Sequence, residues 1–225
     1  MGGCDGSLGL IPEPHFCKDV KHSIQLEAYG LRLRPVTVGD AEFIIALRSH
    51  PRVQGNVGDT VPDAASQQRW IETYFERDGD YYFIVETIAN KPVGTIGIYD
   101  VKDGIGQWGR WIIMPEVQVA AFPAAVLVHQ VAFDLLGLTA LVGSVVSTNE
   151  KVLGFHRRFG AEITHVDHKS RYIRGDWIDM IWIRVQRVVW PAMFAKLMPL
   201  AEVAGRALNT PATGVPLVAW PAAQS

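Results

Sequence analysis

The sequence predicts an α+β fold in which one mixed, mostly antiparallel central sheet carries helices on both faces. Strand-like and helix-like periodicities alternate along one continuous stretch, residues 28–188. Three strand-like segments in its middle are joined by short turn-forming links, which is typical of an antiparallel meander. A long apolar helix then separates two further strand-like segments, and such a helix can serve as the crossover that parallel strands need.

The first elements follow a segment without regular periodicity. Residues 1–27 are rich in Gly, Pro and polar residues, which predicts a flexible N-terminal arm. The segment "YGLRLRPV" then alternates leucine with arginine, the pattern of a half-buried strand. Thr37, followed three residues later by Asp40, forms a capping box that opens a helix, and Asp63 opens a second helix after a loop.

The middle of the chain supplies the sheet. The segments "YYFIVETI", "VGTIGIYDV" and "QWGRWIIM" have strand character and are joined by turn-forming residues. The segment "FPAAVLVHQVAFDLLGL" has helical periodicity and ends at Gly137, and "TALVGSVVS" is a buried strand. Because the helix between them is long enough for a crossover, we expect the strands on either side of it to lie side by side and parallel.

A short helix that ends at Gly160 carries a histidine on its apolar stripe. Phe155 and Phe159 belong to this stripe, and His156 lies on the same side of the helix. A buried histidine is more often a satisfied core residue than a functional one. Evidence from the rest of the sequence is therefore needed to choose between a core role and a functional role for His156.

The C-terminal part adds a hairpin and a helical extension. The segments "AEITHVDHKSRY" and "DWIDMIWIRVQ" predict a closing hairpin. The chain is thus divided into a domain over residues 28–188, a helical extension over 189–208 interrupted by Pro199, and a disordered tail over 209–225. The apolar stripe of the extension, which includes Leu200, is expected to pack on its own domain, with a homodimer contact as the alternative.

The composition fits one globular protein of the cytosol. The chain has 225 residues, of which 48% are hydrophobic and 20% charged, so it is long enough to bury a core. A net charge of -2 without a run of Lys or Arg argues against nucleic acid as the main partner. No uninterrupted apolar run has membrane-spanning length, so membrane insertion is not expected. Cys4 and Cys17 both lie in the arm, which is compatible with a reducing cytoplasmic compartment.

A metal site is not expected from the histidines. His165 and His168 flank Asp167, but on a strand these two histidines point to opposite faces of the sheet. A serine nucleophile is not indicated either, because the sequence contains no G-x-S-x-G turn.

Three features converge where the two parallel strands end. The segment "MPEVQVAAFP" joins a strand to a helix, and its backbone N–H groups can bind an anion beside the small residues Val119, Ala120 and Ala121. Where the parallel strands splay, the exposed edge of one can accept an extended ligand. Asn149 and His156 are expected to face the same gap, which makes a functional role for the histidine as well supported as a role in the core.

Several segments, in this order and spacing, resemble those of one enzyme family. "LRLRPVTVGDAEFIIALRS" resembles the opening strand and helix of the Gcn5-related N-acetyltransferases (GNAT), and "WGRWIIMPE" resembles their acetyl-CoA-binding strand. "VAFDLLGLTALVGSVVSTNEKVLGFHRRFGAEI" resembles their core motif. Two branches are most similar: acetyltransferases of nucleotide-linked amino sugars, favoured by the loop before Trp70 and by "DYYFIV", and protein or peptide N-terminal acetyltransferases.

The resemblance implies acetyl-CoA as co-substrate. Its pantetheine would bond to the backbone of the fourth strand, and its pyrophosphate would lie on the loop that follows. The residues implied in cofactor binding are Ile112, Ile113, Met114, Val119, Ala120, Ala121, Asn149, Phe155 and Arg158.

His156 occupies the position of the family's tyrosine, which protonates the leaving thiolate. The resemblance therefore implies that His156 is a general acid, for which the ordinary pKa of histidine suits neutral pH. The family's phosphate loop reads Gln/Arg-x-x-Gly-x-Gly/Ala, and "EVQVAA" puts Glu116 and Val119 at its first and fourth positions. These departures keep open a third hypothesis, a catalytically inactive binding module on the same fold.

The acceptor side is less well defined by sequence. Asp100 is the first candidate for the general base, with a role in capping the turn as the alternative, and Asp179 in "DWIDM" is the second. Candidates for substrate binding, some of which are equally compatible with core packing, are Asn56, Trp70, Tyr82, Arg110 and Asp179.

Overall fold

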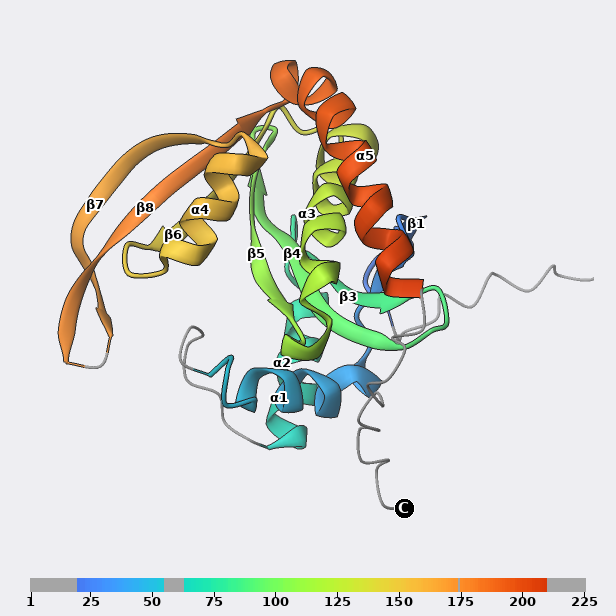
Figure 1. The fold of residues 1–225 in the computed structure, drawn as a ribbon. Helices are drawn as coiled ribbons and strands as arrows, with labels where there is room; N and C mark the ends of the chain where they lie inside the picture. Colours follow the sequence, from blue (N-terminus) through green and yellow to red (C-terminus); the bar gives the residue numbers. More distant parts are fainter. Residues whose placement is uncertain (1–19, 55–62, 174, 210–225) are drawn as a thin grey trace, which may run out of the picture.

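The computed structural model describes residues 20–54, 63–173 and 175–209 and contains one eight-stranded sheet (Figure 1). The strand order is β1-β2-β3-β4-β5-β6-β8-β7. The strands are β1 (Leu26–Ala28), β2 (Leu31–Pro35), β3 (Tyr81–Thr87), β4 (Pro92–Lys102), β5 (Ile105–Ile113), β6 (Ala140–Val146), β7 (Glu162–Ile173) and β8 (Asp176–Gln186). The helices are η1 (Val38–Asp40), α1 (Ala41–Ser49), α2 (Ala64–Phe75), η2 (Pro115–Ala120), α3 (Ala121–Gln130), the π-helix η3 (Val131–Leu135), α4 (Glu150–Phe159), η4 (Arg187–Val189) and α5 (Trp190–Asn209).

The predicted fold class is confirmed. Six of the seven neighbouring strand pairs are antiparallel, and β5 pairs with β6 in parallel. The connection from β5 to β6 runs through η2, α3 and η3, which is the crossover expected from the sequence.

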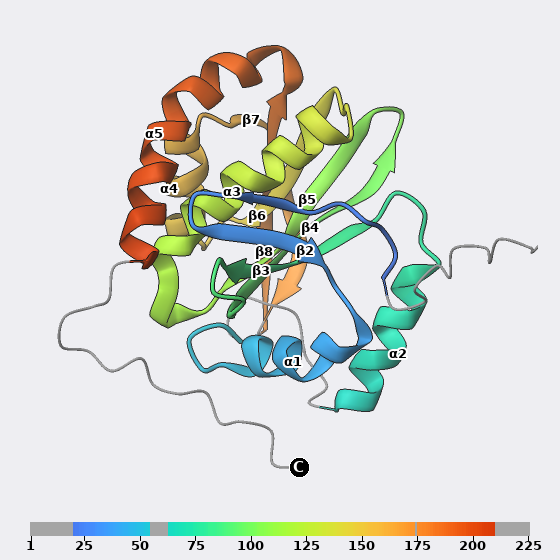
Figure 2. The same cartoon turned by 90° about the vertical axis from the view of Figure 1, so that its right-hand side faces the viewer.

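Alternate residues of β3 show that the sheet is covered on both faces. Phe83 and Val85 belong to a cluster that includes residues of α3 and α5, whereas Tyr82 and Ile84 pack with residues of α1 and α2. Successive side chains of a strand point to opposite faces, so the two clusters lie on opposite sides of the sheet. Figures 1 and 2 show α3, α4 and α5 together on one side and α1 with α2 on the other.

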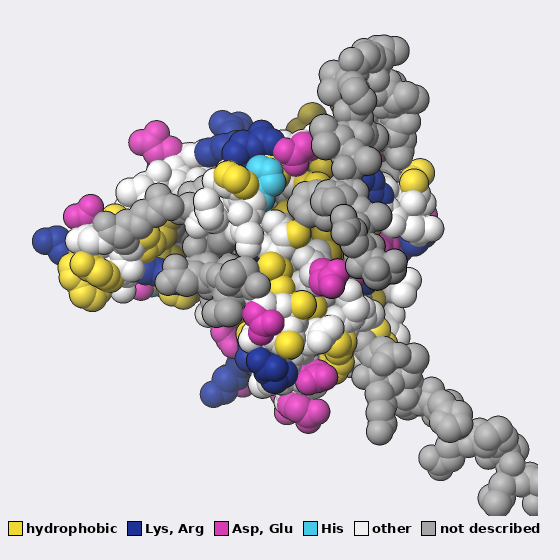
Figure 3. All heavy atoms as spheres, turned by 90° about the horizontal axis from the view of Figure 1, so that it is seen from below, with side chains coloured by type: hydrophobic (Ala, Val, Ile, Leu, Met, Phe, Trp, Pro, Cys, Tyr) yellow, Lys and Arg dark blue, Asp and Glu magenta, His cyan; other side chains and the backbone are white. Residues whose placement is uncertain are grey.

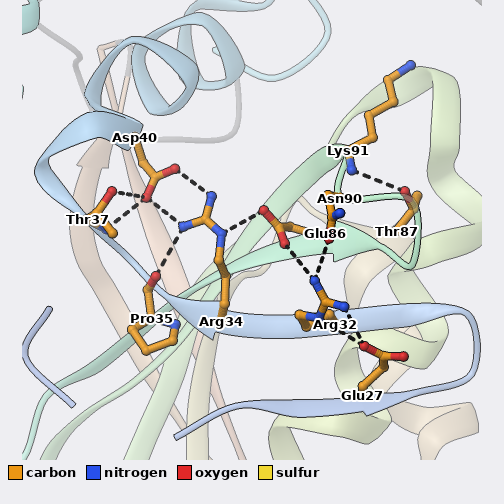
Figure 4. A network of polar contacts seen from close by, with 10 residues as sticks. All are labelled: Glu27, Arg32, Arg34, Pro35, Thr37, Asp40, Glu86, Thr87, Asn90 and Lys91. Atoms are coloured by element: carbon orange, nitrogen blue, oxygen red, sulfur yellow. Dashed lines mark hydrogen bonds and ion pairs between the residues drawn. The ribbon is translucent and has the colours of Figure 1, made fainter. Parts of the chain in front are cut away.

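An ion-pair network joins the first strands to the start of α1 (Figure 4). The predicted capping box between Thr37 and Asp40 is present. The guanidinium of Arg34 donates to both carboxylate oxygens of Asp40, at 2.8 and 2.7 Å, and to Glu86 at 2.6 Å. Since both carboxylates are more than nine-tenths buried, Arg34 supplies the positive charge that makes their burial affordable.

The two ends of the described chain differ from the expected layout. Strand β1 lies across the expected end of the N-terminal arm at residue 27 and pairs with β2. At the other end, α5 continues through Pro199, which was expected to interrupt it. Leu197 and Ala201, on either side of the proline, are both buried and hold the two halves on the domain, whereas Leu200 is 57% exposed and does not belong to the buried stripe.

Two helical segments of the described chain are long and apolar enough to cross a membrane by length and composition. They are Pro115–Leu135, 61% buried within the protein, and Arg187–Leu208, 22% buried. Core helices commonly have such a composition, and the first segment fits that description.

Candidate active site

The gap between β5 and β6 is the first part of the site. The two strands pair in parallel only from Ile105 to Gln107 on β5 and from Ala140 to Val142 on β6. Beyond these residues β5 continues to Ile113 beside β4, and β6 continues beside β8. The facing edges of the two strands are therefore not paired with each other over the C-terminal half of β5. The sequence led us to expect such an unpaired edge.

A β-bulge at Arg110 shapes β5 at the closed end of this gap. The pairing with β4 shifts between Thr95 and Gly97, and Arg110 has a positive φ of 48°. The extra residue restarts the alternation of side chains, so that Trp108 and Trp111 both point to the face of α3 and α4. Arg110 points to the opposite face, which α1 and α2 cover.

The backbone of β5 offers two residues to a ligand in the gap. The Met114 N–H donates to the carbonyl of Val93 on β4, and the carbonyl of Ile112 also points to β4, where it lies against Gly94. Alternate residues of a strand direct their backbone groups to the same side. Among the predicted cofactor-binding residues of this strand, Ile113 therefore faces the gap with its backbone, whereas Ile112 and Met114 face β4; Trp111, which sequence reasoning missed, also faces the gap.

The loop after β5 does not need glycine. Residues Pro115–Ala120 form η2, and α3 begins at Ala121. The left-handed residues of the described chain all lie outside this segment, so Val119 is not forced into a conformation that favours glycine. Val119 is 41% exposed and Ala120 is buried at the entry to α3.

Two side chains of this loop have defined partners. Glu116, expected to repel a phosphate, forms an ion pair with Arg52 from the segment after α1, and His50 lies 3.6 Å away. Gln118 donates from its amide to the carbonyls of Ile113 and Met114. If the phosphate-loop pattern is read from Gln118 instead of Glu116, its first position holds a glutamine and its fourth position holds the small residue Ala121. Its sixth position then holds Pro123 in place of glycine or alanine.

His156, on α4, packs against the side chains of β5 and is 4% exposed. Its ring is in edge contact with Trp108, Trp111 and Phe155, and its Nδ1 is buried without a hydrogen-bond partner. Burial disfavours the imidazolium and lowers the pKa of His156 to about 4. The expectation that this histidine titrates near neutral pH is therefore wrong, and at pH 7 the ring is neutral.

The other residues predicted on the cofactor side have mixed surroundings. Asn149 caps α4 by accepting from the Val152 N–H, and Gly160 ends the helix in a left-handed conformation, as the sequence indicated. Phe155 stacks on Phe159 and makes tilted and edge contacts with Trp111 and Phe122. Arg158 is exposed and folds back over Gly154.

The opposite face of β5 holds a buried cation among aromatic rings. Arg110 forms two hydrogen bonds with the carboxylate of Asp80, one of them 2.8 Å long, and its guanidinium lies 5.3, 5.1 and 4.7 Å from the rings of Trp70, Tyr82 and Tyr99. The Asp80 side chain is 5% exposed. Sequence reasoning selected Trp70, Tyr82 and Arg110 but missed Asp80, because nothing local in "ERDGDYY" indicates a partner thirty positions further on.

On the side of α1 and α2, acidic and basic side chains of the described residues are interspersed, not separated into patches of one sign (Figure 3). Asp100, the predicted base, is exposed at a second bulge with φ 52°. It follows Tyr99, which pairs with Gln107, so it lies level with the paired part of β5 and β6. Asp179 accepts from the backbone N–H of Lys169 and pairs with His168, and these contacts lower its pKa. Asn56 lies outside the described residues.

The histidines of β7 pair with carboxylates and not with one another. His165 lies 3.7 Å from Asp167, and His168 lies 3.0 Å from Asp179. Within the described ranges, no group of three or more His, Cys, Asp or Glu side chains could hold a metal ion.

Comparison with known proteins provides independent information. The model of a family described as "Acetyltransferase (GNAT) domain" matches residues 30–162. Comparison with curated protein sequences gave no match. Among solved structures, the chain is similar to apo FdhC, described as a nucleotide-linked sugar GNAT, with 27% identity over 80% of this chain and 99% of that one and a TM-score of 0.67.

Two more distant structures support the fold alone. A variant of the spermidine N-acetyltransferase SpeG from Vibrio cholerae is 16% identical, covers 73% of this chain and 98% of its own, and has a TM-score of 0.66. A probable acetyltransferase of the GNAT family from Chromobacterium violaceum is 15% identical, covers 76% and 94%, and has a TM-score of 0.67.

Proposed function

The chain belongs to the GNAT family of acetyltransferases, and we propose that this acetyl-CoA-dependent N-acetyltransferase acts on the amine of a nucleotide-linked amino sugar. The observation that carries this choice of acceptor is the similarity to FdhC, which extends over 99% of that chain. The acceptor amine would attack the thioester carbonyl of acetyl-CoA, and the residues of this chain would bind, orient and enclose the two substrates.

The gap between β5 and β6 is the proposed binding site of acetyl-CoA. The backbone groups of Trp111 and the N–H of Ile113 would bond to the amides of the pantetheine, as a neighbouring strand would. The diphosphate would lie at the N-terminus of α3, beside Val119 and Ala121, where the helix dipole favours negative charge. Glu116 does not oppose this arrangement, since Arg52 neutralises it.

His156 is proposed to orient the sulfur of the thioester. A neutral imidazole can donate one hydrogen bond, and the Nδ1 of His156 is buried without a partner. A thiolate that forms next to the ring would raise the pKa of the imidazole by opposite-charge attraction, which would assist proton transfer only at that stage. The aromatic rings of Trp108, Trp111 and Phe155 exclude water from the same position.

Calorimetric titration with acetyl-CoA tests the first part of the proposal. Val119→Asp places a negative charge at the diphosphate position and should weaken binding at least about tenfold, equivalent to about 1.4 kcal/mol. Val188→Asp, the same substitution at a valine that is 81% exposed on η4, is the matched control and should bind as the unaltered protein does. Failure of acetyl-CoA to bind the unaltered protein would refute the proposal.

The acceptor is tested by thiol release. Nucleoside diphosphate amino sugars, free amino sugars, spermidine and peptides with free N-termini are compared at equal concentration. Thiol release with nucleoside diphosphate amino sugars but not with free amino sugars supports a nucleotide-linked amino sugar as the acceptor. Turnover of peptides alone would replace it with the N-terminal acetyltransferase hypothesis.

A further inference from the structure

Arg110 completes a cation site that has all the parts needed to bind a positively charged amine. One carboxylate, that of Asp80, accepts two hydrogen bonds from the guanidinium. Three aromatic rings lie 4.7–5.3 Å from its central carbon, within the range in which a ring attracts a cation. Only 19% of the Arg110 side chain is exposed, so a ligand cation could not bind there without displacing it.

The sheet beneath the site is adapted to this occupant. Gly97 lies directly under the Arg110 side chain, where a Cβ would be 3.6 Å from Arg110 Cδ and 3.4 Å from the Tyr82 ring. Gly109 lies under Tyr99, where a Cβ would meet the phenol oxygen at 2.7 Å. The two glycines therefore allow the guanidinium and the phenol to lie flat against the strands.

The backbone also favours this side-chain position. Arg110 adopts a left-handed conformation, which is unfavourable for a residue with a Cβ and persists only when surrounding contacts hold it. The bulge points Arg110 away from the gap and toward Asp80. Two of its nitrogens already bond to Asp80 and are therefore not free to bind a substrate, the role for which the sequence made Arg110 a candidate.

We propose that Arg110 is a resident cation that occupies an amine-binding site on the acceptor face and thereby excludes cationic acceptors. This inference rests on the proposed function in one respect: the proposed function assigns the acceptor to the face of the sheet that α1 and α2 cover. The backbone of Trp111, the next residue, faces the gap between β5 and β6. The cation site of Arg110 therefore lies beside the proposed acetyl-CoA site, on the face of the sheet that α1 and α2 cover. Removal of the guanidinium would leave a buried carboxylate and three rings, which attract a primary ammonium group.

Binding of spermidine, used as the probe, tests the proposal without any acetyl transfer. The unaltered protein should not bind spermidine measurably. Arg110→Ala should bind it with an affinity at least about tenfold above the upper limit measured for the unaltered protein. The double variant Arg110→Ala/Asp80→Asn lacks the carboxylate and should lose the gain. Arg77→Ala removes a guanidinium that lies 5.1 Å over Trp70 but leaves Asp80 paired, so this control should not bind spermidine.

The outcomes separate this proposal from the proposed function. Spermidine binding by the unaltered protein or by Arg77→Ala, or its absence in Arg110→Ala, would overturn the resident-cation role whether or not an amino sugar is acetylated. If Arg110→Ala does not fold in buffer, ethylguanidinium should restore its folding in a saturable manner and should not restore the double variant. The proposal would also be overturned if ethylguanidinium restored the folding of Arg110→Ala and of the double variant to the same extent.

Discussion

Protonation of His156 is expected to destabilise the folded protein. The ring is 4% exposed and packs against Trp108 and Trp111, and its pKa is lowered to about 4, from 6.5 in an unfolded chain, because burial disfavours its charge. Between these two values the unfolded state binds more protons than the folded state. The contribution of His156 to stability is therefore fully present above about pH 6.5 and is lost as the pH falls toward 4.

The size of this effect follows from the two pKa values. At pH 7 about one His156 ring in a thousand is protonated in the folded state. Between pH 7 and pH 4.5 the titration of His156 lowers the free energy of unfolding by about 2.5 kcal/mol. Each unit of difference between the folded and unfolded pKa corresponds to about 1.4 kcal/mol. His156→Phe keeps an aromatic ring at the site and removes the titration, so the variant should lose about 2.5 kcal/mol less over the same range.

Urea unfolding at several pH values between 4.5 and 7 measures this difference. The comparison of variant with unaltered protein removes the contributions of titrating groups that do not interact with His156, such as the half-buried His22. His165→Phe, at a ring that is 56% exposed on β7, controls for the replacement of an imidazole by a phenyl ring. An identical pH dependence in His156→Phe and the unaltered protein would refute the desolvation argument. So would an NMR titration of the His156 ring with a midpoint near 6.5.

Two further predictions concern stability. Arg34→Ala leaves the buried Asp40 without its cation and Glu86 with only the more distant Arg32, and should cost about 3–5 kcal/mol in urea unfolding. Arg32→Ala removes a pair with the exposed Glu27 and only a 3.9 Å contact with Glu86, so it should cost about 1 kcal/mol or less; equal losses would contradict the role of burial. Gly205→Ala should lower the thermal midpoint by the equivalent of about 1–3 kcal/mol, because its Cβ would collide with the backbone of Tyr29. Gly154→Ala, with only the tips of a flexible side chain nearby, should raise the midpoint, and the reverse order of the two midpoints would contradict this explanation.

The parts of the fold that local signals determine were predictable. A capping box identifies its helix because the bonds form between residues three positions apart, as at Thr37 and Asp40. Gly160 ends its helix for an equally local reason, the left-handed conformation. Strand β1 was not predictable, since its three residues depend on pairing with Leu31–Leu33 and carry no pattern of their own. The continuation of α5 through Pro199 depends likewise on tertiary packing.

The candidate site was predictable only in part. Sequence periodicity placed His156 on a buried face, but its pKa depends on Trp108 and Trp111, which come from another element. A strand without a bulge would direct Trp108 and Trp111 to opposite faces, because they are separated by an odd number of positions. Nothing in "QWGRWII" shows that a residue is inserted, and Asp80 becomes a partner of Arg110 only once the sheet has formed.

The bulge at Arg110 couples the two sides of the site. Without the inserted residue, Trp111 would point toward α1 and α2 and its backbone would pair with β4. The gap would then lose both the aromatic wall beside His156 and an unpaired backbone edge, while Asp80 would face an indole in place of a cation. An uncompensated buried carboxylate costs several kcal/mol, so the contact between Arg110 and Asp80 opposes this shift in register. The same ion pair that closes the acceptor face to cations therefore also holds β5 in the register that leaves the gap open for an extended ligand.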